Sequence, residues 1–163
     1  MAFAFKQLRP ADLTPARALL AVFGEAFEDP ESYVRRPPAD AYLAALLGKP
    51  HVIALVAVDE GGAVAGGLVA YELEKLEQAR SELYIYDLAV GEPHRRKGVA
   101  TGLIRALAAI GKQRGAQVIF VQADRTDQPA LRLYRSLGTG VVVHQFDIPV
   151  EQLEPLPRAK SIR

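Results

Sequence analysis

The spacing of apolar and polar residues divides the chain into strands and helices. Residues 52–58 form a nearly continuous apolar run, residues 59–62 have turn composition, and residues 63–73 form a second extended run. Two such runs joined by a short glycine-containing turn predict a β-hairpin. Residues 81–90 alternate Leu83, Ile85 and Ala89 with Tyr84, Tyr86 and Leu88, which favours a central strand covered on both faces. Shorter apolar runs predict three more strands, over residues 3–8, 118–123 and 141–146.

Helices are predicted from the remaining periodic segments and their end signals. Thr14 before Pro15 has the pattern of an N-cap with proline at the first helical position, so a helix should run from there to about Phe27. Asp127 is expected to cap the last helix, and Gly138 to end it. Two further helices are expected over residues 39–47 and 98–114, each followed by a glycine. Residues 28–38, rich in charge and proline, predict a surface loop or a lid over a cationic substrate.

This order of elements predicts the fold class. A β-α-α-β-β-β-α-β-α-β order indicates an α/β (α+β) domain with a mixed sheet. The chain has 163 residues, 50% of them hydrophobic, which suits one domain with a substantial core. We expect a single domain over residues 1–150 and a loose C-terminal tail over residues 151–163.

Composition excludes several classes of function. Twenty Lys and Arg against nineteen Asp and Glu give a net charge of +1, which favours neither nucleic acid nor an anionic membrane as partner. The sequence has no cysteine, and His51, His94 and His144 are too scattered to suggest a zinc site. No apolar stretch approaches the roughly 20 residues of a membrane span, and the N-terminus lacks a signal-peptide pattern. We therefore expect a cytoplasmic protein without a metal.

Residues 86–101 combine an apolar strand, a cationic turn and the start of a helix. The backbone N–H groups of Gly98, Val99 and Ala100 would be free at this helix start, where the helix dipole favours an anion. Three consecutive cations precede them: Arg95, Arg96 and Lys97. The pattern predicts a phosphate or pyrophosphate site, although a solvated basic turn has the same pattern. The sequence contains neither G-x-x-x-x-G-K-[ST] nor G-x-G-x-x-G, so P-loop and Rossmann sites are not expected.

Two patterns together resemble the GNAT superfamily of acetyl-coenzyme A dependent N-acetyltransferases. The first is R-x-x-G-x-A over residues 95–100, and the second is D-x-x-A-x-x-x-Y-x-x-x-G over residues 127–138. Each is loose by itself, but their order and spacing on successive strand-helix units are specific. Four runs are further similar to the aminoglycoside 3-N-acetyltransferases of that superfamily: residues 77–82, 84–90, 121–124 and 146–148. The resemblance implies a mixed, mostly antiparallel central sheet flanked by helices.

The resemblance also implies how acetyl-coenzyme A binds. The strand at residues 88–90 would pair its backbone with the pantetheine arm, whose amides can extend a sheet edge. The helix start would hold the pyrophosphate through its backbone N–H groups. The implied coenzyme-binding residues are Leu88, Ala89, Val90, Arg95, Arg96, Lys97, Gly98, Val99, Ala100, Thr101, Asp127 and Ala130.

Tyr134 matches the superfamily tyrosine that protonates the departing thiolate, and a phenol within hydrogen-bond reach can do so. The alternative is a core tyrosine.

The implied acceptor, an aminoglycoside, is a polycation that needs several carboxylates, and its attacking amine must lose a proton. We expect catalysis by Tyr134 and Asp87, with Asp87 or Asp147 as the base or as the anchor of the amine. Glu82, Asp124 and Asp147 are the expected substrate contacts, although each alone could be solvated or capping.

The function implied by the resemblance is direct acetyl transfer from acetyl-coenzyme A to an aminoglycoside, at the 3-amino group of the deoxystreptamine ring, with antibiotic resistance as the result. One alternative is acetylation of a polyamine, a peptide N-terminus or a small metabolite. Another is a coenzyme A binding module without catalysis, which would not require Tyr134. Tyr84 and Tyr86 are expected to pack rather than to react. Because members of the superfamily often form dimers, a homodimer through residues 141–146 and the tail is a further expectation.

Overall fold

The computed structural model describes residues 2–152. The chain forms two compact units, Met1–Asp124 and Arg125–Arg163. The expected tail falls mostly outside the described residues; only its start, within a short 3-10 helix over Val150–Gln152, can be compared with the prediction.

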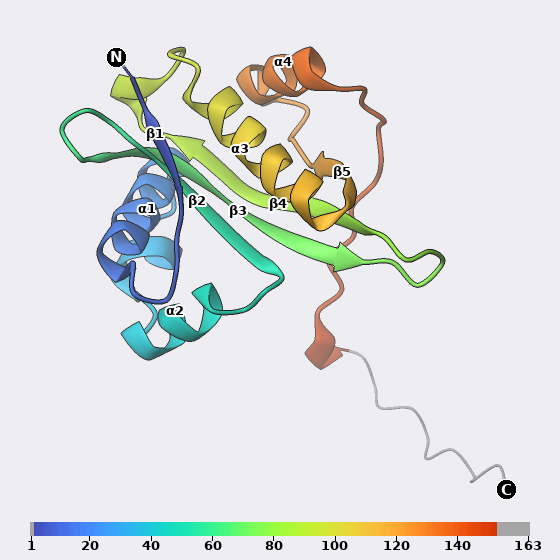
Figure 1. The fold of residues 1–163 in the computed structure, drawn as a ribbon, viewed down its shortest axis with the longest axis horizontal. Coiled ribbons are helices and arrows are strands. Elements are labelled where there is room, and N and C mark those ends of the chain that lie inside the picture. The colour runs from blue at the N-terminus through green and yellow to red at the C-terminus, as the bar shows by residue number, and fades with distance from the viewer. Residues whose placement is uncertain (1, 153–163) are drawn as a thin grey trace, which may run out of the picture. The chain divides into compact units, whose positions relative to one another are not determined.

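The first unit is built on a five-stranded sheet (Figure 1). Its strands follow one another in sequence order across the sheet: β1 (Ala4–Gln7), β2 (Val52–Val58), β3 (Val64–Glu74), β4 (Ser81–Val90) and β5 (Ala116–Val121). Neighbouring strands are antiparallel except β4 and β5, which are parallel because a helix crosses over between them. The expected mixed, mostly antiparallel sheet flanked by helices is confirmed.

Helices cover both faces of this sheet. On one side lie α1 (Leu13–Ala26) and α2 (Asp40–Leu47), and on the other lies α3 (Val99–Arg114) (Figure 1). Two short helices occupy connections of this unit: a π-helix over Glu31–Arg35 and a 3-10 helix over Glu92–His94. The second unit contains α4 (Gln128–Leu137).

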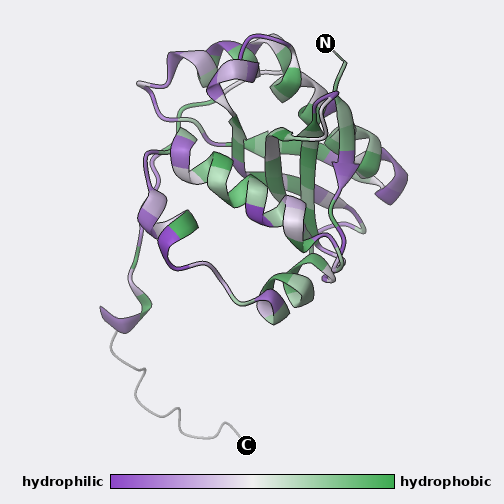
Figure 2. Cartoon of the chain, turned by 90° about the vertical axis from the view of Figure 1, so that its left-hand side faces the viewer, coloured by the Kyte–Doolittle hydropathy of each residue, from purple (hydrophilic) through white to green (hydrophobic). Residues whose placement is uncertain are grey.

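The sheet separates two apolar clusters, one on the α3 face and one on the α1 face, and this explains why the sequence of β2 is continuously apolar. Ile53 and Leu55 pack with Leu103 of α3, whereas Ala54 and Val56 pack in the cluster formed with α1. Figure 2 shows hydrophobic residues concentrated on the strands between the helices. A strand buried on both faces needs apolar side chains at successive positions, so it loses the alternation of a half-exposed strand.

A β-bulge in β4 reverses the direction of its side chains. Asp87 pairs with Val69 and Ile85 pairs with Ala70, so Tyr86 is the extra residue on β4. Leu83 and Ile85 pack in the α3 cluster, but Ala89 packs in the α1 cluster, and Leu88 and Val90 pack against the α3 cluster instead. The predicted single alternation is therefore wrong beyond Ile85, because one inserted residue turns every later side chain to the opposite face.

Two other expectations are corrected. The first helix begins at Leu13 with Asp12 in the N-cap position, so Thr14 is not the cap. Residues 141–146 are not a strand, since residues 139–149 have no regular secondary structure. The run has strand-like composition, but a strand needs a neighbour for its backbone groups, and within residues 2–152 the sheet ends at β5.

Candidate active site

The edge of β4 that faces β5 is open over its second half. The pairing of β4 with β5 ends at Ile85 and Val121, while β4 continues to Val90. On its other side, β4 stays paired with β3 as far as Val90. The segment Asp87–Val90 is therefore held straight by β3 and has no paired strand on the β5 side among the described residues. An extended ligand with amide groups fits such an edge, which is the property expected of residues 88–90.

The turn after β4 forms an exposed, positively charged helix start. Gly98 is the N-cap of α3 with a φ of 80°, and Arg96 has a φ of 58°. The first bond of the helix runs from the Gly102 N–H to the Gly98 carbonyl at 2.9 Å, so the N–H groups of residues 99–101 have no partner within the helix. These groups and the adjacent cations have the chemistry of a phosphate cradle, as expected for residues 95–101.

The three cations of the turn differ in how they are held. Arg95 Nε donates to the Val90 carbonyl at 3.2 Å, and Lys97 Nζ donates to the Pro93 carbonyl at 2.7 Å. Arg96 makes no hydrogen bond or ion pair with other residues of the described chain, and it is exposed. Of the three side chains, Arg96 is therefore the one best able to pair with an incoming phosphate.

Asp87 is a half-buried carboxylate without a cationic partner. Its Oδ1 accepts a hydrogen bond from the Tyr33 hydroxyl at 3.1 Å, and no Lys or Arg of residues 2–152 pairs with it. Burial raises the pKa of Asp87, and the hydrogen bond from Tyr33 opposes that rise. A carboxylate with a raised pKa is a better proton acceptor than an ordinary surface aspartate, as a general base requires.

Tyr33 is a site residue that the sequence reading missed. It lies in the π-helix that follows α1, within the segment predicted as a surface loop. Tyr33 is the one aromatic residue of residues 28–38, and an aromatic side chain in a charged, proline-rich segment was the sequence feature that could have identified it as a site residue. Its ring also contacts Phe23 and Phe27 of α1, at centroid distances of 5.8 and 5.6 Å. The segment is thus fixed to both α1 and β4 instead of being only a solvated loop.

The other predicted carboxylates lie in different surroundings. Glu82 is already paired, with Arg80 at 2.7 Å and Lys75 at 3.9 Å, so its charge is compensated. Asp124 is exposed at the end of the first unit. Asp147 accepts a hydrogen bond from Gln145 Nε2 at 3.0 Å and is exposed in the second unit. Within the first unit, Asp87 and Glu82 have different hydrogen-bond partners, Tyr33 for Asp87 and Arg80 for Glu82.

Helix α4 carries the second predicted motif. Asp127 Oδ1 accepts a hydrogen bond from the Ala130 N–H at 3.0 Å, which confirms Asp127 as the N-cap. Tyr134 is partly buried, and burial, followed by the charge of Asp127, raises the pKa of its hydroxyl. Tyr134 therefore keeps its proton at neutral pH, as a proton donor must. The contacts of Asp127 and Ala130 with the coenzyme remain predictions.

Tyr86 is 64% exposed at the bulge, and its ring packs edge to face only against the rings of Tyr71 and Tyr84 among the described residues. Tyr84 agrees better with the expectation that these two tyrosines pack, since its ring stacks on Phe120 at a centroid distance of 4.9 Å.

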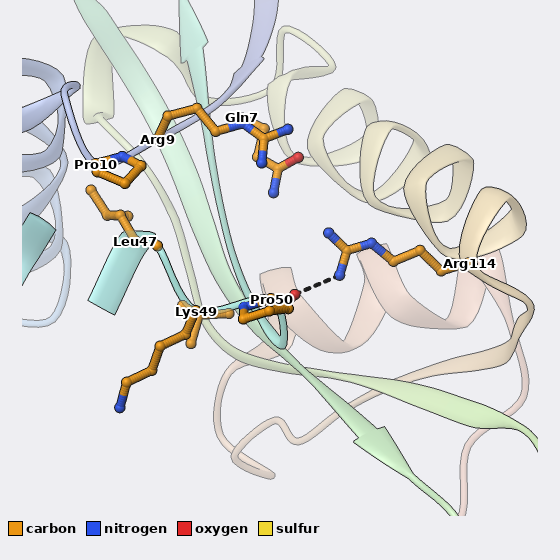
Figure 3. A pocket seen from close by; sticks show the side chains of 9 residues that line it. Gln7, Arg9, Pro10, Leu47, Lys49, Pro50 and Arg114 are labelled. Carbon is orange, nitrogen blue, oxygen red and sulfur yellow. Dashed lines mark hydrogen bonds between the residues drawn. The ribbon is translucent and has the colours of Figure 1, made fainter. Parts of the chain in front are cut away.

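A small pocket of about 180 Å³ lies elsewhere in the first unit (Figure 3). Arg114 lines it and donates to the Pro50 carbonyl at 2.6 Å and to Glu72 at 2.8 Å. None of the predicted site residues lines this pocket. Across residues 2–152, no three His, Asp or Glu side chains gather to hold a metal ion, and no helix there has the length and apolar character needed to cross a membrane.

Known proteins resemble this chain in sequence and in fold. One solved structure, of an aminoglycoside acetyltransferase from an uncultured soil metagenomic sample, is 51% identical and has a TM-score of 0.89; the match covers 92% of this chain and 99% of that chain. Another aminoglycoside acetyltransferase from such a sample, in complex with sisomicin, is 31% identical with a TM-score of 0.81, over 90% of this chain and 96% of that chain.

Among curated proteins, the streptothricin acetyltransferase of Streptomyces lavendulae is 32% identical over 73 residues, which are 45% of this chain and 39% of that protein. The chain spans less than two fifths of the length of the curated relatives that it matches. Residues 18–139 match the family described as Acetyltransferase (GNAT). Because this match includes β4, the cationic helix start and α4, the chain belongs to the GNAT acetyltransferase family.

Proposed function

We propose that this GNAT acetyltransferase transfers the acetyl group of acetyl-coenzyme A to an amine of an aminoglycoside, at the 3-amino group of the deoxystreptamine ring. The observation that carries the proposal is Asp87, a half-buried carboxylate with no cation beside it in the described chain. An uncompensated charge in such a place is costly unless a ligand supplies the opposite charge. The two aminoglycoside acetyltransferases of similar structure support the choice of ligand.

The open edge of β4 and the helix start would hold the coenzyme. Leu88, Ala89 and Val90 would pair with the amides of the pantetheine arm, because their backbone is held extended by β3. The N–H groups of Val99, Ala100 and Thr101 would donate to the pyrophosphate. The proposed charged contacts around them are Arg95, Arg96 and Lys97.

Asp87 and Tyr134 would handle the two protons of the reaction. Asp87 takes a proton from the substrate ammonium, directly or through water, and the free amine then attacks the thioester carbonyl carbon. The new C–N bond forms as the C–S bond breaks, and Tyr134 donates its hydroxyl proton to the departing thiolate. The acylated nitrogen then releases its second proton, which restores the Tyr134 hydroxyl through solvent. Direct transfer needs no covalent enzyme intermediate, and the sequence has no cysteine to form one.

The product explains the proposed biological role. Acetylation removes the positive charge of the amine, so the drug loses an ion pair with its RNA target, and resistance follows. We place this activity in the cytoplasm, where that target lies.

We also include a homodimer in the proposal, because five apolar side chains of residues 141–148 are exposed: Val141, Val142, Val143, Phe146 and Ile148.

The test is an assay of thiol release from acetyl-coenzyme A with gentamicin, sisomicin, spermidine and a short peptide offered in parallel. We expect turnover with an aminoglycoside, and NMR of the product should place the acetyl group on the 3-amino nitrogen. Turnover with spermidine or the peptide alone would replace the proposal by its alternative within the same chemistry. Coenzyme binding without turnover of any amine would favour a non-catalytic module.

A further inference from the structure

Four aromatic side chains form a row across the face of the sheet that lies opposite α3. We define the aromatic row as Tyr71 of β3, Tyr86 and Tyr84 of β4, and Phe120 of β5. The direction of the row follows from strand alternation. Ala70, Ile85 and Val121 pack in or against the α3 cluster, so the neighbouring residues on each strand point to the other face.

The rings of the row are in contact with one another in sequence. Tyr71 and Tyr86 meet edge to face at 6.0 Å, and Tyr86 and Tyr84 meet in the same manner at 5.8 Å. Tyr84 then stacks on Phe120 at 4.9 Å, and its hydroxyl donates to Gln122 Oε1 at 3.0 Å. These mutual contacts hold the rings in place before any ligand binds, which lowers the entropy cost of binding.

The row is accessible, and one of its ends is negatively charged. Tyr86 is 64% exposed and Phe120 is 37% exposed. Asp87 follows Tyr86 directly and pairs with Val69, which lies two residues before Tyr71 on β3, so Asp87 and Tyr71 are on the same face of the sheet. Burial, followed by the charge of Asp87, raises the pKa of Tyr71. An aromatic face attracts a cation, and the attraction grows when a carboxylate stands beside it.

We propose that the aromatic row binds the body of the acceptor, a polycationic amine, while Asp87 receives its reacting ammonium group. Under the proposed function, on which this inference rests, the bound body is the amino-sugar rings beyond the acetylated ring. Their ammonium groups lie over the aromatic faces, and their apolar C–H surfaces are removed from water against them. The row then sets affinity and substrate choice, and it takes no part in proton transfer.

The test removes one ring face at a time. Tyr86→Leu and Phe120→Leu should each raise the dissociation constant of gentamicin, measured by calorimetry without coenzyme, by roughly two- to thirtyfold. KM should rise in parallel, with kcat unchanged. Tyr86→Phe keeps the ring and should bind like the wild type. Phe5→Leu is the matched control, because the Phe5 ring lies against Gly102 of α3, on the opposite side of the sheet.

Tyrosine fluorescence gives a second readout. The chain has six tyrosines and no tryptophan, so tyrosine dominates its emission, and three of the six belong to the row. Gentamicin should change this emission in the wild type and change it less in Tyr86→Leu. Unaltered affinity in both leucine variants, with wild-type unfolding temperatures, would overturn the inference.

The two proposals can fail separately. If gentamicin is acetylated and neither leucine variant weakens its binding, the row is excluded and the proposed function stands. If only spermidine binds and reacts, the proposed function fails, and the row is supported when Tyr86→Leu weakens spermidine binding. If no amine binds the wild type, both proposals are overturned.

Discussion

Asp87 and Tyr33 belong to separate segments of the chain, and one hydrogen bond of 3.1 Å joins them. Three phenols respond to the charge of Asp87: Tyr33 from the π-helix, Tyr71 from β3 and Tyr84 from β4. At the scale of the residue, burial raises the pKa of Asp87, the hydrogen bond from Tyr33 opposes that rise, and no cation of residues 2–152 pairs with the carboxylate. A half-buried carboxylate without a cationic partner suits proton transfer, but its charge should lower the free energy of unfolding at neutral pH.

We expect Asp87→Asn to raise the unfolding temperature at neutral pH. The folded protein raises the pKa of Asp87, so stability is lost as pH rises from the ordinary carboxyl pKa of about 3.9 through the folded pKa, and asparagine removes this loss. The advantage of the variant should shrink as pH falls toward 4, as thermal unfolding at several pH values would show. A lower unfolding temperature for the variant at pH 7 would contradict the assignment. Acetyl transfer should be lost in the same variant.

Tyr33→Phe tests the partner of Asp87. Without the hydroxyl, Asp87 loses the hydrogen bond that lowers its pKa, so the acid limb of the pH profile of kcat/KM should move to higher pH. The phenyl ring keeps the contacts with Phe23 and Phe27, so the fold should persist. A rate reduced equally at every pH would show that Tyr33 does not act through the ionisation of Asp87.

Tyr134→Phe tests the proposed proton donor. Loss of a general acid typically slows a reaction by roughly a hundred- to ten-thousandfold, and we expect a fall in kcat at the lower end of this range, since thiolates leave readily. Coenzyme affinity, measured by calorimetry, should change little. An unaltered kcat would remove Tyr134 from the mechanism.

At the scale of the element, β4 and α3 form the unit that should hold the coenzyme. The strand ends with an open edge, and the helix begins with free N–H groups behind a cationic turn. Gly98 permits this turn because its φ of 80° is readily adopted by glycine. Both features come from one continuous segment; the residues predicted the cationic helix start, and the family resemblance implied the open edge.

Arg96→Ala should weaken coenzyme A binding by about tenfold, the effect of one charged hydrogen bond, as measured by calorimetry. Arg105→Ala is the matched control, because Arg105 is an exposed cation in the middle of α3 and should leave the affinity unchanged. Equal effects of the two substitutions would mean that only general charge matters and that the pyrophosphate lies elsewhere.

At the scale of the whole molecule, the net charge of +1 says little about binding, because cationic and anionic sites occupy different elements. The cations at residues 95–97 lie beyond the end of β4, whereas Asp87 lies within the strand. Residues 141–148 contain five exposed apolar side chains close together in sequence. This segment has the composition of a strand and lacks a partner strand in the described chain.

We expect a homodimer in solution that depends on this segment. Replacing Val141 and Val143 by Asp should raise the dissociation constant of the dimer at least tenfold, as sedimentation equilibrium would measure, because each change places a charge in an apolar contact. Thr139→Asp is a control in the same unit, with a residue that is already polar. A wild-type protein that stays monomeric at high concentration would contradict this expectation.

Features that depend only on neighbouring residues could be predicted from the sequence alone. Asp127 caps α4 and the cationic turn precedes α3, because capping and dipole effects act within one turn of a helix. The β2–β3 hairpin also follows from local turn chemistry. The strand over residues 141–146 was predicted wrongly because a strand also requires a partner, which composition does not provide.

The direction of the Asp87 side chain and its contacts depend on how the sheet packs, and local sequence does not reveal them. The bulge at Tyr86 arises from the pairing of β4 with β3, and it turns Asp87 toward the face that carries α1. There Asp87 meets Tyr33, which is distant in sequence, and the aromatic row continues over β4 to β5. Strand register and contacts between distant segments depend on the packing of the whole sheet, so no local pattern in the sequence could specify them.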